Sequence, residues 1–367
     1  MQLLSEHACI EAIKKGEYFQ AVIQDGAFSL KIDEYSFFIC TAIHNGHRLR
    51  QELVNKCALD EAERLHEEDP FTGDLISSLP ITLVALDSRY EYDLNRSPEH
   101  CIYEQAWGKS VWSSQLTEEE CKVSKHKHHV FYRVLGVLVE KLQSQFGACL
   151  IYDIHSYNYR RLTTTDTPVF NIGTEQLNKL RWNSVIQHWN KTLNKATLHN
   201  VNVRSATDEV FFGRGYLGNF VREHYRNTLV LPTEVKKIFM KENTGDVYPL
   251  VLPELKEVLK QSILKNALYF SKHHTNKNHS RKAVLLSSNL ESSILKLDRQ
   301  LYHIARGIET LTYINPQNIA VEKKRFFAKN YNYLPSFTYK HLDMNPYEFR
   351  EKLYRLPVDD IRDVSIQ

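Results

Sequence analysis

Three short apolar segments of the sequence are each followed by a residue that can bind a metal ion or act as a base. These are 36–43 (SFFICTAI) before His44, 148–154 (ACLIYDI) before His155, and 228–233 (TLVLPT) before Glu234. Strands that are buried on both faces are apolar nearly throughout, as these segments are. Since ligand sites in an open parallel sheet gather beyond the carboxyl ends of its strands, we expect the three residues to lie close together.

Two histidines at such an edge indicate a metal site. Catalytic zinc takes about three protein ligands from His, Asp or Glu and keeps one position open for water. His44 and His155 can supply two imidazoles, and we expect the third ligand from the acidic cluster 66–74 (HEEDPFTGD). Glu234 is then a candidate base for the water.

Positive side chains that could bind an anion follow the apolar segment 81–87. Arg89 and Arg96 are the candidates, and they could stabilise a developing oxyanion. Each assignment has a structural alternative. A histidine at a strand end is often only hydrogen-bonded, the acidic cluster could form a solvated helix cap, and the arginines could pair with Glu91 and Asp93 on the surface.

Expected strands and helices alternate along the sequence around these residues, which predicts an α/β fold with a mostly parallel or mixed sheet flanked by helices. The expected strands are 36–43, 81–87, 148–154, 169–172 and 228–233, and the expected helices are 49–65, 117–146 and 176–191. In the helix 117–146, apolar residues recur at a spacing that suits one buried face.

The domain organisation follows from where this alternation stops. Residues 1–270 are expected to form the α/β domain. The polar stretch 271–282 (SKHHTNKNHSRK) lacks apolar periodicity, so we expect a linker over 271–285. Residues 286–367 then form a helical C-terminal appendage.

Composition restricts the classes of function. The 47 Lys and Arg residues nearly balance the 44 Asp and Glu residues, so a net charge of +3 does not indicate nucleic-acid binding. No apolar run approaches the roughly 18 residues of a membrane span. The N-terminus lacks the apolar core of a signal peptide, and the six cysteines are scattered without CxxC spacing, so we expect a cytoplasmic protein without a disulfide framework.

Seven segments occur in an order that resembles the N-formylglutamate amidohydrolase family, whose fold is similar to that of the zinc carboxypeptidases. They are AIHNG, HEEDPFTGDLI, LDSRYEYDLNRSP, IYDIHS, FNIGTE, GRGYLGNF and LPTEVKKIFMKENTG. The resemblance covers about residues 30 to 250. It implies one zinc ion bound by His44, Asp69 and His155, with Glu234 as the general base; Glu68 remains an alternative third ligand.

The resemblance also implies a substrate site. Asn95 and Arg96 would bind a substrate carboxylate, for which an arginine fork is suited, and Arg89 would polarise the scissile carbonyl. Asp153 lies two residues before His155, so both side chains leave a strand on the same face and Asp153 could orient the imidazole.

The expected function is therefore zinc-dependent hydrolysis of the amide bond of a small N-acyl amino acid similar to N-formylglutamate. The alternatives are a zinc carboxypeptidase that acts on a peptide C-terminus and a non-catalytic binding module that kept the fold. The tail, INPQNIAVEKKRFFAKNYNYLPSF onward, resembles the N-terminal part of the QEGLP-motif, tyrosine-carboxypeptidase-like family without its catalytic helix. We expect the appendage to pack on the hydrolase domain or to bind a protein partner.

Overall fold

The computed structural model describes residues 2–23, 25–162 and 166–276. Its strands are β1 Gln2–Leu4, β2 Phe19–Ile23, β3 Phe28–Ile32, β4 Phe38–Ala42, β5 Ile81–Ala85, β6 Gln105–Ala106, β7 Lys109–Ser110, β8 Cys149–Tyr157, β9 Phe170–Ile172, β10 Ser205–Thr207 and β11 Thr228–Lys236. Its helices are α1 Glu6–Lys15, α2 Gln51–Val54, α3 Glu61–Glu67, α4 Thr72–Ile76, α5 Glu118–Phe146, α6 Lys179–Asn194, α7 Tyr216–His224 and α8 Val251–His274.

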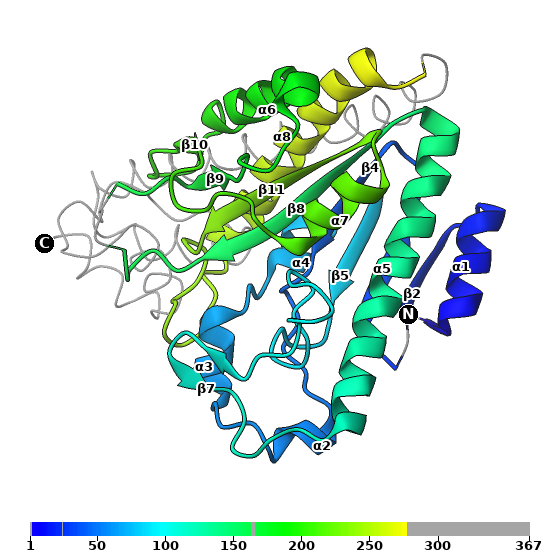
Figure 1. Cartoon of the computed structure of the whole chain (residues 1–367). Coiled ribbons are helices and arrows are strands. Elements are labelled where there is room, and N and C mark those ends of the chain that lie inside the picture. Colours follow the sequence, from blue (N-terminus) through cyan, green and yellow to red (C-terminus); the bar gives the residue numbers. More distant parts are fainter. Residues whose placement is uncertain (1, 24, 163–165, 277–367) are drawn as a thin grey trace, which may run out of the picture.

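Within these residues, nine strands form one mixed sheet in the order β1-β2-β3-β5-β4-β8-β11-β9-β10, while β6 and β7 form a separate hairpin (Figure 1). The central strands β5, β4, β8 and β11 are parallel neighbours, whereas β3 and β9 join them antiparallel. The predicted α/β class is thereby confirmed, and all five predicted strands are present as β4, β5, β8, β9 and β11.

Two central strands are longer than the sequence indicates. β8 continues to Tyr157 and β11 to Lys236, whereas the apolar runs end at 154 and 233. The two strands pair with each other in parallel over nine residues. This pairing satisfies the backbone of the polar residues as well, so a change in side-chain polarity does not end the strand.

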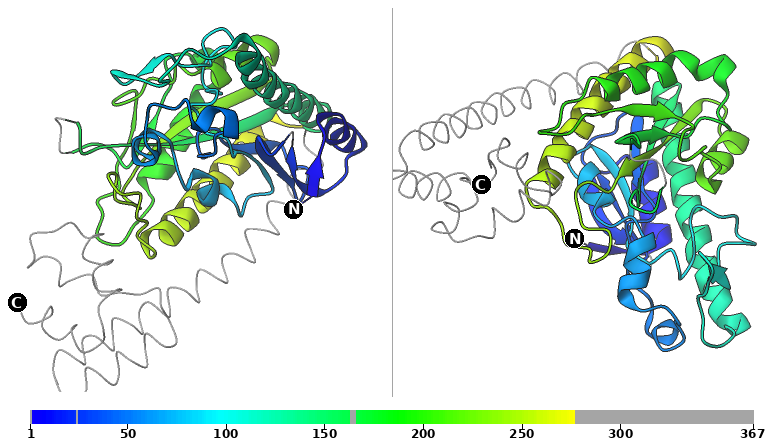
Figure 2. Two further views of the ribbon diagram at one scale, coloured as in Figure 1. Left: turned by 90° about the horizontal axis from the view of Figure 1, so that it is seen from below. Right: turned by 90° about the vertical axis from the view of Figure 1, so that its left-hand side faces the viewer.

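Helices cover both faces of the sheet (Figures 1 and 2). On one face, α5 packs with α1 and α7, and Tyr132 of α5 contacts Phe220 of α7 with ring centroids 4.7 Å apart. On the other face lie α4, α6 and α8. There Tyr152 of β8 meets the ring of Trp189 at 5.1 Å and donates a 2.8 Å hydrogen bond to Asn266 of α8.

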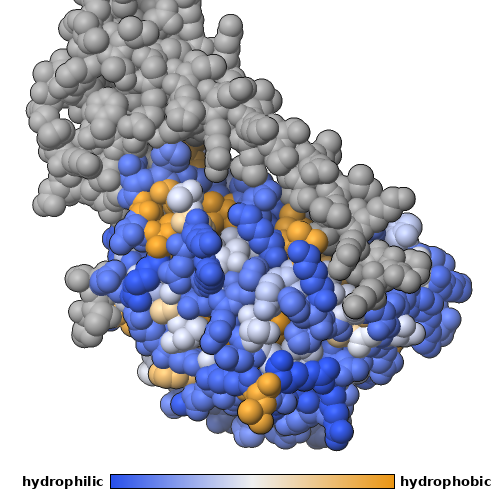
Figure 3. Space-filling view, turned by 90° about the horizontal axis from the view of Figure 1, so that it is seen from above, coloured by the Kyte–Doolittle hydropathy of each residue, from blue (hydrophilic) through white to orange (hydrophobic). Residues whose placement is uncertain are grey.

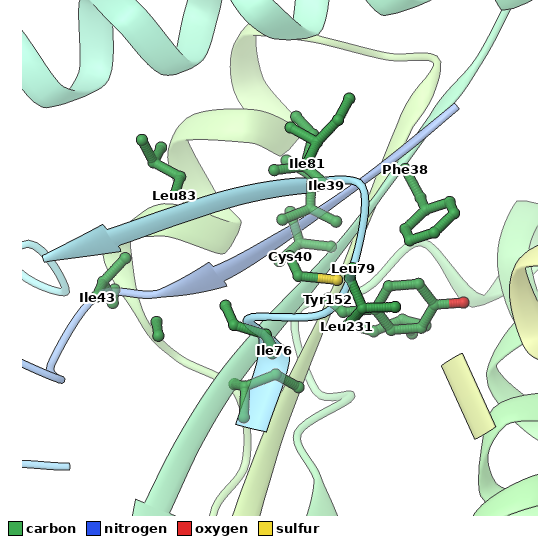
Figure 4. Packing of buried hydrophobic residues seen from close by; sticks show 14 of the residues in the cluster. Phe38, Ile39, Cys40, Ile43, Ile76, Leu79, Ile81, Leu83, Tyr152 and Leu231 are labelled. Atoms are coloured by element: carbon green, nitrogen blue, oxygen red, sulfur yellow. The ribbon is translucent and has the colours of Figure 1, made fainter. Parts of the chain in front are cut away.

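The core fills both faces of the central strands. Cys40 of β4 and Ile76 of α4 are fully buried on the face of α4 and α8, and Ile39, which leaves β4 on the opposite face, is fully buried too (Figure 4). Burial of such aliphatic side chains contributes roughly 1.5–3 kcal/mol each. This packed centre holds the carboxyl ends of the central strands in fixed positions.

The expected helix 49–65 is two helices, α2 and α3. Between them the amide of Ala58 donates a 2.8 Å hydrogen bond to the carbonyl of Val111. Asp60 then caps α3 in a capping box with Glu63. The tertiary contact and the new cap together interrupt a sequence whose apolar spacing alone favours one helix.

At the other end of the domain, α8 runs to His274, so residues 271–274 of the expected linker form its last turn. The rest of that linker beyond residue 276, and the appendage 286–367, lie outside the described residues. Seen from the side of α6 and α8, the domain surface is mainly hydrophilic with a few separate hydrophobic patches (Figure 3). No helix among the described residues is both long and apolar enough for a membrane span.

Candidate metal centre

The predicted histidines and glutamate meet where β4, β8 and β11 lie side by side. The parallel register of β8 and β11 places His155 beside Glu234, so both side chains leave the sheet on the same face. β4 pairs with β8 only as far as Thr41 opposite Asp153. His44 follows β4 by two residues, and its ring centroid lies 4.8 Å from that of His155.

Gly46 allows the chain to leave β4 at this point. A Cβ atom there would lie 2.2 Å from the backbone oxygen of Asp87 and 2.6 Å from that of Leu86. The glycine is therefore required because two backbone segments pass in contact.

Three buried ligand atoms converge at this edge of the sheet. His44 Nδ1 lies 3.1 Å from His155 Nδ1 and 3.3 Å from Asp69 Oδ2, and His155 Nδ1 lies 3.1 Å from the same Asp69 oxygen. Among the described residues, these are the three His, Cys, Asp or Glu side chains grouped closely enough to hold a metal ion.

Each imidazole points its other nitrogen at a carboxylate. His44 Nε2 lies 2.8 Å from Asp93 Oδ1, and His155 Nε2 lies 3.0 Å from Asp153 Oδ2. A neutral imidazole that donates its Nε2–H in this way presents a lone pair at Nδ1. Two lone pairs and a carboxylate oxygen then face one another, an arrangement that a cation between them stabilises.

The donor set and its dimensions fit zinc. Tetrahedral zinc with bonds of about 2.0–2.1 Å to nitrogen and oxygen holds its ligand atoms roughly 3.3 Å apart. The observed separations of 3.1, 3.1 and 3.3 Å are close to that value. Two imidazoles and one carboxylate also leave a fourth position open.

Asp69, rather than Glu68, belongs to the group of side chains that could hold a metal ion. The carboxylate of Glu68 accepts hydrogen bonds from His47 and the hydroxyl of Ser88, and it is not part of this group. The amide of Asp69 instead donates a 2.9 Å hydrogen bond to the carbonyl of His44. This backbone contact fixes the acidic loop against the end of β4.

The electrostatics of the cluster favour a charged carboxylate. When no cation is bound and the imidazoles are protonated at Nδ1, burial acts to raise the pKa of Asp69, but the hydrogen bonds from His155 and His44 outweigh it and hold that pKa below its usual range. Burial acts to lower the pKa of His155, but the charge of Asp153 raises it well above the ordinary value. The pocket therefore stabilises positive charge beside Asp69.

Glu234 is partly buried next to the cluster. Burial raises the pKa of this carboxyl group to about 8, while the positive charges of His155 and Arg89 act in the opposite direction. A cation held by the cluster would lower the pKa further by the same Coulombic effect. A carboxyl group whose pKa lies near neutral pH is suited to proton transfer.

Asp93 connects the cluster to the neighbouring arginine. Besides His44, its carboxylate accepts hydrogen bonds from Arg89 Nη2 at 2.8 Å, from the amide of Asn95 at 2.6 Å and from the hydroxyl of Tyr103. The ion pair between Arg89 and Asp93, which the sequence offers as a structural alternative, is therefore present. It is a buried pair within the site, with side chains 12% and 0% exposed, and not a surface ion pair.

A cavity of about 380 Å³ opens above the cluster. All the predicted site residues line it: His44, Asp69, Arg89, Asn95, Arg96, Asp153, His155 and Glu234. The structure thus brings together in one place residues that are separated by up to 190 positions in the sequence (234 − 44).

Asn95 and Arg96 lie on the wall of this cavity. Asn95 Oδ1 is buried, and the described residues offer it no hydrogen-bond partner. Arg96 is exposed; its backbone carbonyl lies 2.9 Å from His128 Nε2, and its side chain contacts the hydroxyl of Tyr103. No carboxylate in the described part of the chain forms an ion pair with Arg96.

Sequence reasoning missed several residues of this site. Asp93 was considered only as a surface partner of the arginines, and not as a partner of His44. Lys237 was not noticed: its buried ammonium donates hydrogen bonds to the backbone carbonyls of His66 at 2.9 Å and Glu68 at 2.7 Å, which anchors the acidic loop. The sequence offers one signal for a buried lysine here, because Lys237 directly precedes the apolar pair Ile238–Phe239.

This chain is similar to known proteins in its sequence and in its fold. Residues 36–235 match the family model described as N-formylglutamate amidohydrolase. The solved N-formylglutamate amidohydrolase of Ralstonia eutropha is 18% identical with a TM-score of 0.56, and the match covers 67% of this chain and 98% of that one. A search of the curated proteins finds no match.

Two further solved structures are more distant. A gene product of Agrobacterium tumefaciens is 14% identical with a TM-score of 0.49, and the match covers 65% of this chain and 94% of that one. A metallo-carboxypeptidase of Burkholderia cenocepacia is 13% identical with a TM-score of 0.35, over 72% of this chain and 68% of that one.

The family model spans more than half of the chain and includes β4, the acidic loop, β8 and all but the last residue of β11. It therefore contains every residue of the metal cluster as well as Glu234 and the cavity residues Arg89, Asn95 and Arg96. This chain belongs to the N-formylglutamate amidohydrolase family.

Proposed function

We propose that the protein is a zinc-dependent hydrolase that cleaves the amide bond of a small N-acyl amino acid with a free carboxylate. The observation that carries the proposal is the group of three buried ligand atoms, His44 Nδ1, His155 Nδ1 and Asp69 Oδ2, at the floor of a cavity that Glu234 and Arg96 also line. Zinc at these residues would supply Lewis acidity toward a water molecule and the acyl oxygen.

The other residues have roles that follow from their chemistry. Glu234 accepts the proton of the attacking water and passes it to the leaving amine, which requires a carboxyl pKa near the working pH. Arg96 binds the substrate carboxylate, and the side-chain amide of Asn95 donates a further hydrogen bond to it.

Arg89 is assigned to the acyl oxygen. A guanidinium has five N–H donors, and four contacts of Arg89 are to Asp93, the carbonyl of Glu67 and the hydroxyl of Tyr103. One Nη1–H is left without a partner among the described residues. Asp93 holds the guanidinium in place, so this donor is oriented before the substrate binds.

Peptide trimming is the second candidate, because the same carboxylate-binding residues would serve it. The volume of about 380 Å³ favours the small substrate, since it lies at the low end of the range for small-molecule pockets. Both reactions use the same cluster and the same base, so they differ only in how much of the substrate lies beyond the cavity.

The test is hydrolysis by the zinc-loaded full chain of a panel of N-formyl and N-acetyl amino acids, with C-terminal dipeptides and tetrapeptides for comparison. We expect release of the free amino acid from the N-acyl panel, loss of this activity with a chelator and its recovery with added zinc. Hydrolysis of peptides alone would replace the proposal with the carboxypeptidase. Inactivity of zinc-loaded protein toward both panels would refute the proposal.

A further inference from the structure

Among the described residues, the cavity offers one cationic side chain that neither a carboxylate nor a backbone carbonyl engages. Five cationic side chains line it, and four of them are already engaged within the described residues. The four are Arg89 with Asp93 at 2.8 Å, Arg161 with Glu67 at 2.6 Å, Arg214 with Glu175 at 2.8 Å, and Lys237 with two backbone carbonyls. Arg96 remains, so the charge balance suits one substrate carboxylate.

The mouth of the cavity carries exposed aromatic rings instead. Eight large apolar side chains are exposed among the described residues, and three of the eight line this one cavity. They are Trp107, Phe211 and Phe212, which are 45%, 36% and 42% exposed, and we call them the aromatic rim. Exposed aromatic side chains that gather at a cleft indicate a binding surface for apolar groups.

Trp107 is held in place at the tip of the β6–β7 hairpin. Its φ of +48° lies in the left-handed region, which a bulky residue adopts at a cost of about 1–3 kcal/mol. The rings of Tyr90 and Tyr103 lie 5.9 Å from its ring, and the guanidinium of Arg89 lies 4.9 Å above it. The tryptophan is thus fixed beside the arginine that is assigned to the acyl oxygen.

The loop that carries Phe211 and Phe212 is held in place by residues of β9 and β8. Asn171, which is paired with Glu234 across β9 and β11, donates a 2.7 Å hydrogen bond to the carbonyl of Phe211 and accepts one from the amide of Val210 at 2.9 Å. The ring of Phe211 packs on that of Tyr157 at 5.6 Å. The loop that carries the two phenylalanines is therefore tied to β9, the strand that pairs with the one carrying the base.

Close backbone packing keeps this loop in position. A Cβ atom on Gly173 would lie 2.3 Å from the Cα of Gly213, whose φ of +76° is in the region that favours glycine. The guanidinium of Arg214 lies 5.1 Å from the ring of Phe212, and this arginine is paired with Glu175. The cation nearest to Phe212 is thus neutralised.

We propose that the substrate carries a single carboxylate and a large apolar side chain, as in an N-acylated phenylalanine, leucine or tryptophan, and that the aromatic rim binds this side chain. The inference rests on the proposed hydrolase function. N-formylglutamate has a second carboxylate, which would have to lose water against aromatic rings, while the cations of the cavity other than Arg96 are already engaged by carboxylates or backbone carbonyls. A buried phenyl group gains from the same surface.

The first experiment measures binding without turnover. Zinc-loaded Glu234→Gln protein is titrated by calorimetry with N-formyl-L-phenylalanine, N-formyl-L-alanine and N-formyl-L-glutamate. We expect the phenylalanine compound to bind about 10- to 100-fold more tightly than the alanine compound, with the glutamate compound no tighter than alanine. The wild-type kcat/KM values should follow the same order.

Variants then assign the selectivity to the rim. Phe212→Ala and Trp107→Ala should each lower the phenylalanine-to-alanine ratio of kcat/KM by about 3- to 10-fold, since one ring supplies only part of the contact. Leu180→Ala is the matched control, because Leu180 is fully exposed on α6 and does not line the cavity; it should leave this ratio unchanged.

The outcomes separate this inference from the proposed function. If N-formylglutamate binds and reacts best, the hydrolase stands and the aromatic rim is not a substrate subsite. If the rim variants and Leu180→Ala have the same ratio as wild type, the inference also fails. If none of the three compounds binds or reacts, both the proposed function and the inference are overturned.

Discussion

Replacement of Asp93 by Asn should weaken zinc binding although Asp93 is not a ligand. Its Oδ1 accepts the Nε2–H of His44 at 2.8 Å, which fixes the ring so that Nδ1 faces the cluster. Loss of such a partner typically lowers metal affinity by about 10- to 100-fold, which corresponds to roughly 1.4–2.7 kcal/mol. Arg89 also loses its buried carboxylate, so the free energy of unfolding should fall by about 3–5 kcal/mol.

A matched control separates the two effects. Asp87 is buried like Asp93 and pairs with Lys127 at 3.0 Å and Arg48 at 3.1 Å, but it contacts neither His44 nor His155. Asp87→Asn should therefore lower stability while leaving zinc affinity within about twofold of wild type.

The assay is competition for zinc against a chromophoric chelator, with thermal unfolding measured in excess EDTA. We expect Asp93→Asn to lose both affinity and stability, and Asp87→Asn to lose stability alone. Unchanged zinc affinity in Asp93→Asn would refute the reasoning, as would an equal loss of affinity in the two variants.

Three further predictions follow from single residues. Glu234→Gln should retain zinc and lose kcat by about 10²- to 10⁴-fold in the N-acyl amino acid assay; full activity would exclude Glu234 as the base. Burial lowers the pKa of His128 from 6.5 to about 4, so the unfolded chain binds a proton between these values and stability falls as the pH drops through this window. The free energy of unfolding should fall by about 2 kcal/mol between pH 7 and pH 5. Chemical denaturation at the two pH values should show a smaller fall for His128→Asn than for the wild type, and an equal fall would contradict this assignment. Gly215→Ala should raise KM and lower stability, because the new Cβ would lie 2.0 Å from Asn95 Oδ1. Gly218→Ala in α7 should instead stabilise the protein by about 0.5–1 kcal/mol, because nothing lies within 4 Å of its Cβ position. Thermal unfolding that shifts both variants in the same direction would contradict the assignment.

The parts of the site that the sequence predicted are those that a strand carries directly. An apolar run identifies a buried strand, and the parallel arrangement then fixes which of its ends carries the polar residues. His44, His155 and Glu234 follow from this rule alone, and Asp153 follows from the two-residue repeat of a strand. Only the family resemblance singles out Asp69 as the third ligand, because its loop contains several carboxylates.

The parts that the sequence did not predict depend on contacts between distant segments. The hydrogen bonds of Lys237 to the carbonyls of His66 and Glu68 join residues about 170 positions apart, and no local pattern indicates them. The lengths of β8 and β11 were underestimated for the same reason. Most of their last residues are polar, and pairing with each other, together with the pairing of β11 with β9, keeps them extended.

The most direct test of the metal site is the zinc content of the purified full chain, measured by plasma mass spectrometry after dialysis against trace zinc. We predict one zinc per chain in the wild type and less than about one tenth of that in His155→Ala, with Leu180→Ala unchanged. A wild-type protein that holds no zinc, or a His155→Ala protein that holds as much as the wild type, would contradict the assignment of His44, Asp69 and His155 as its ligands.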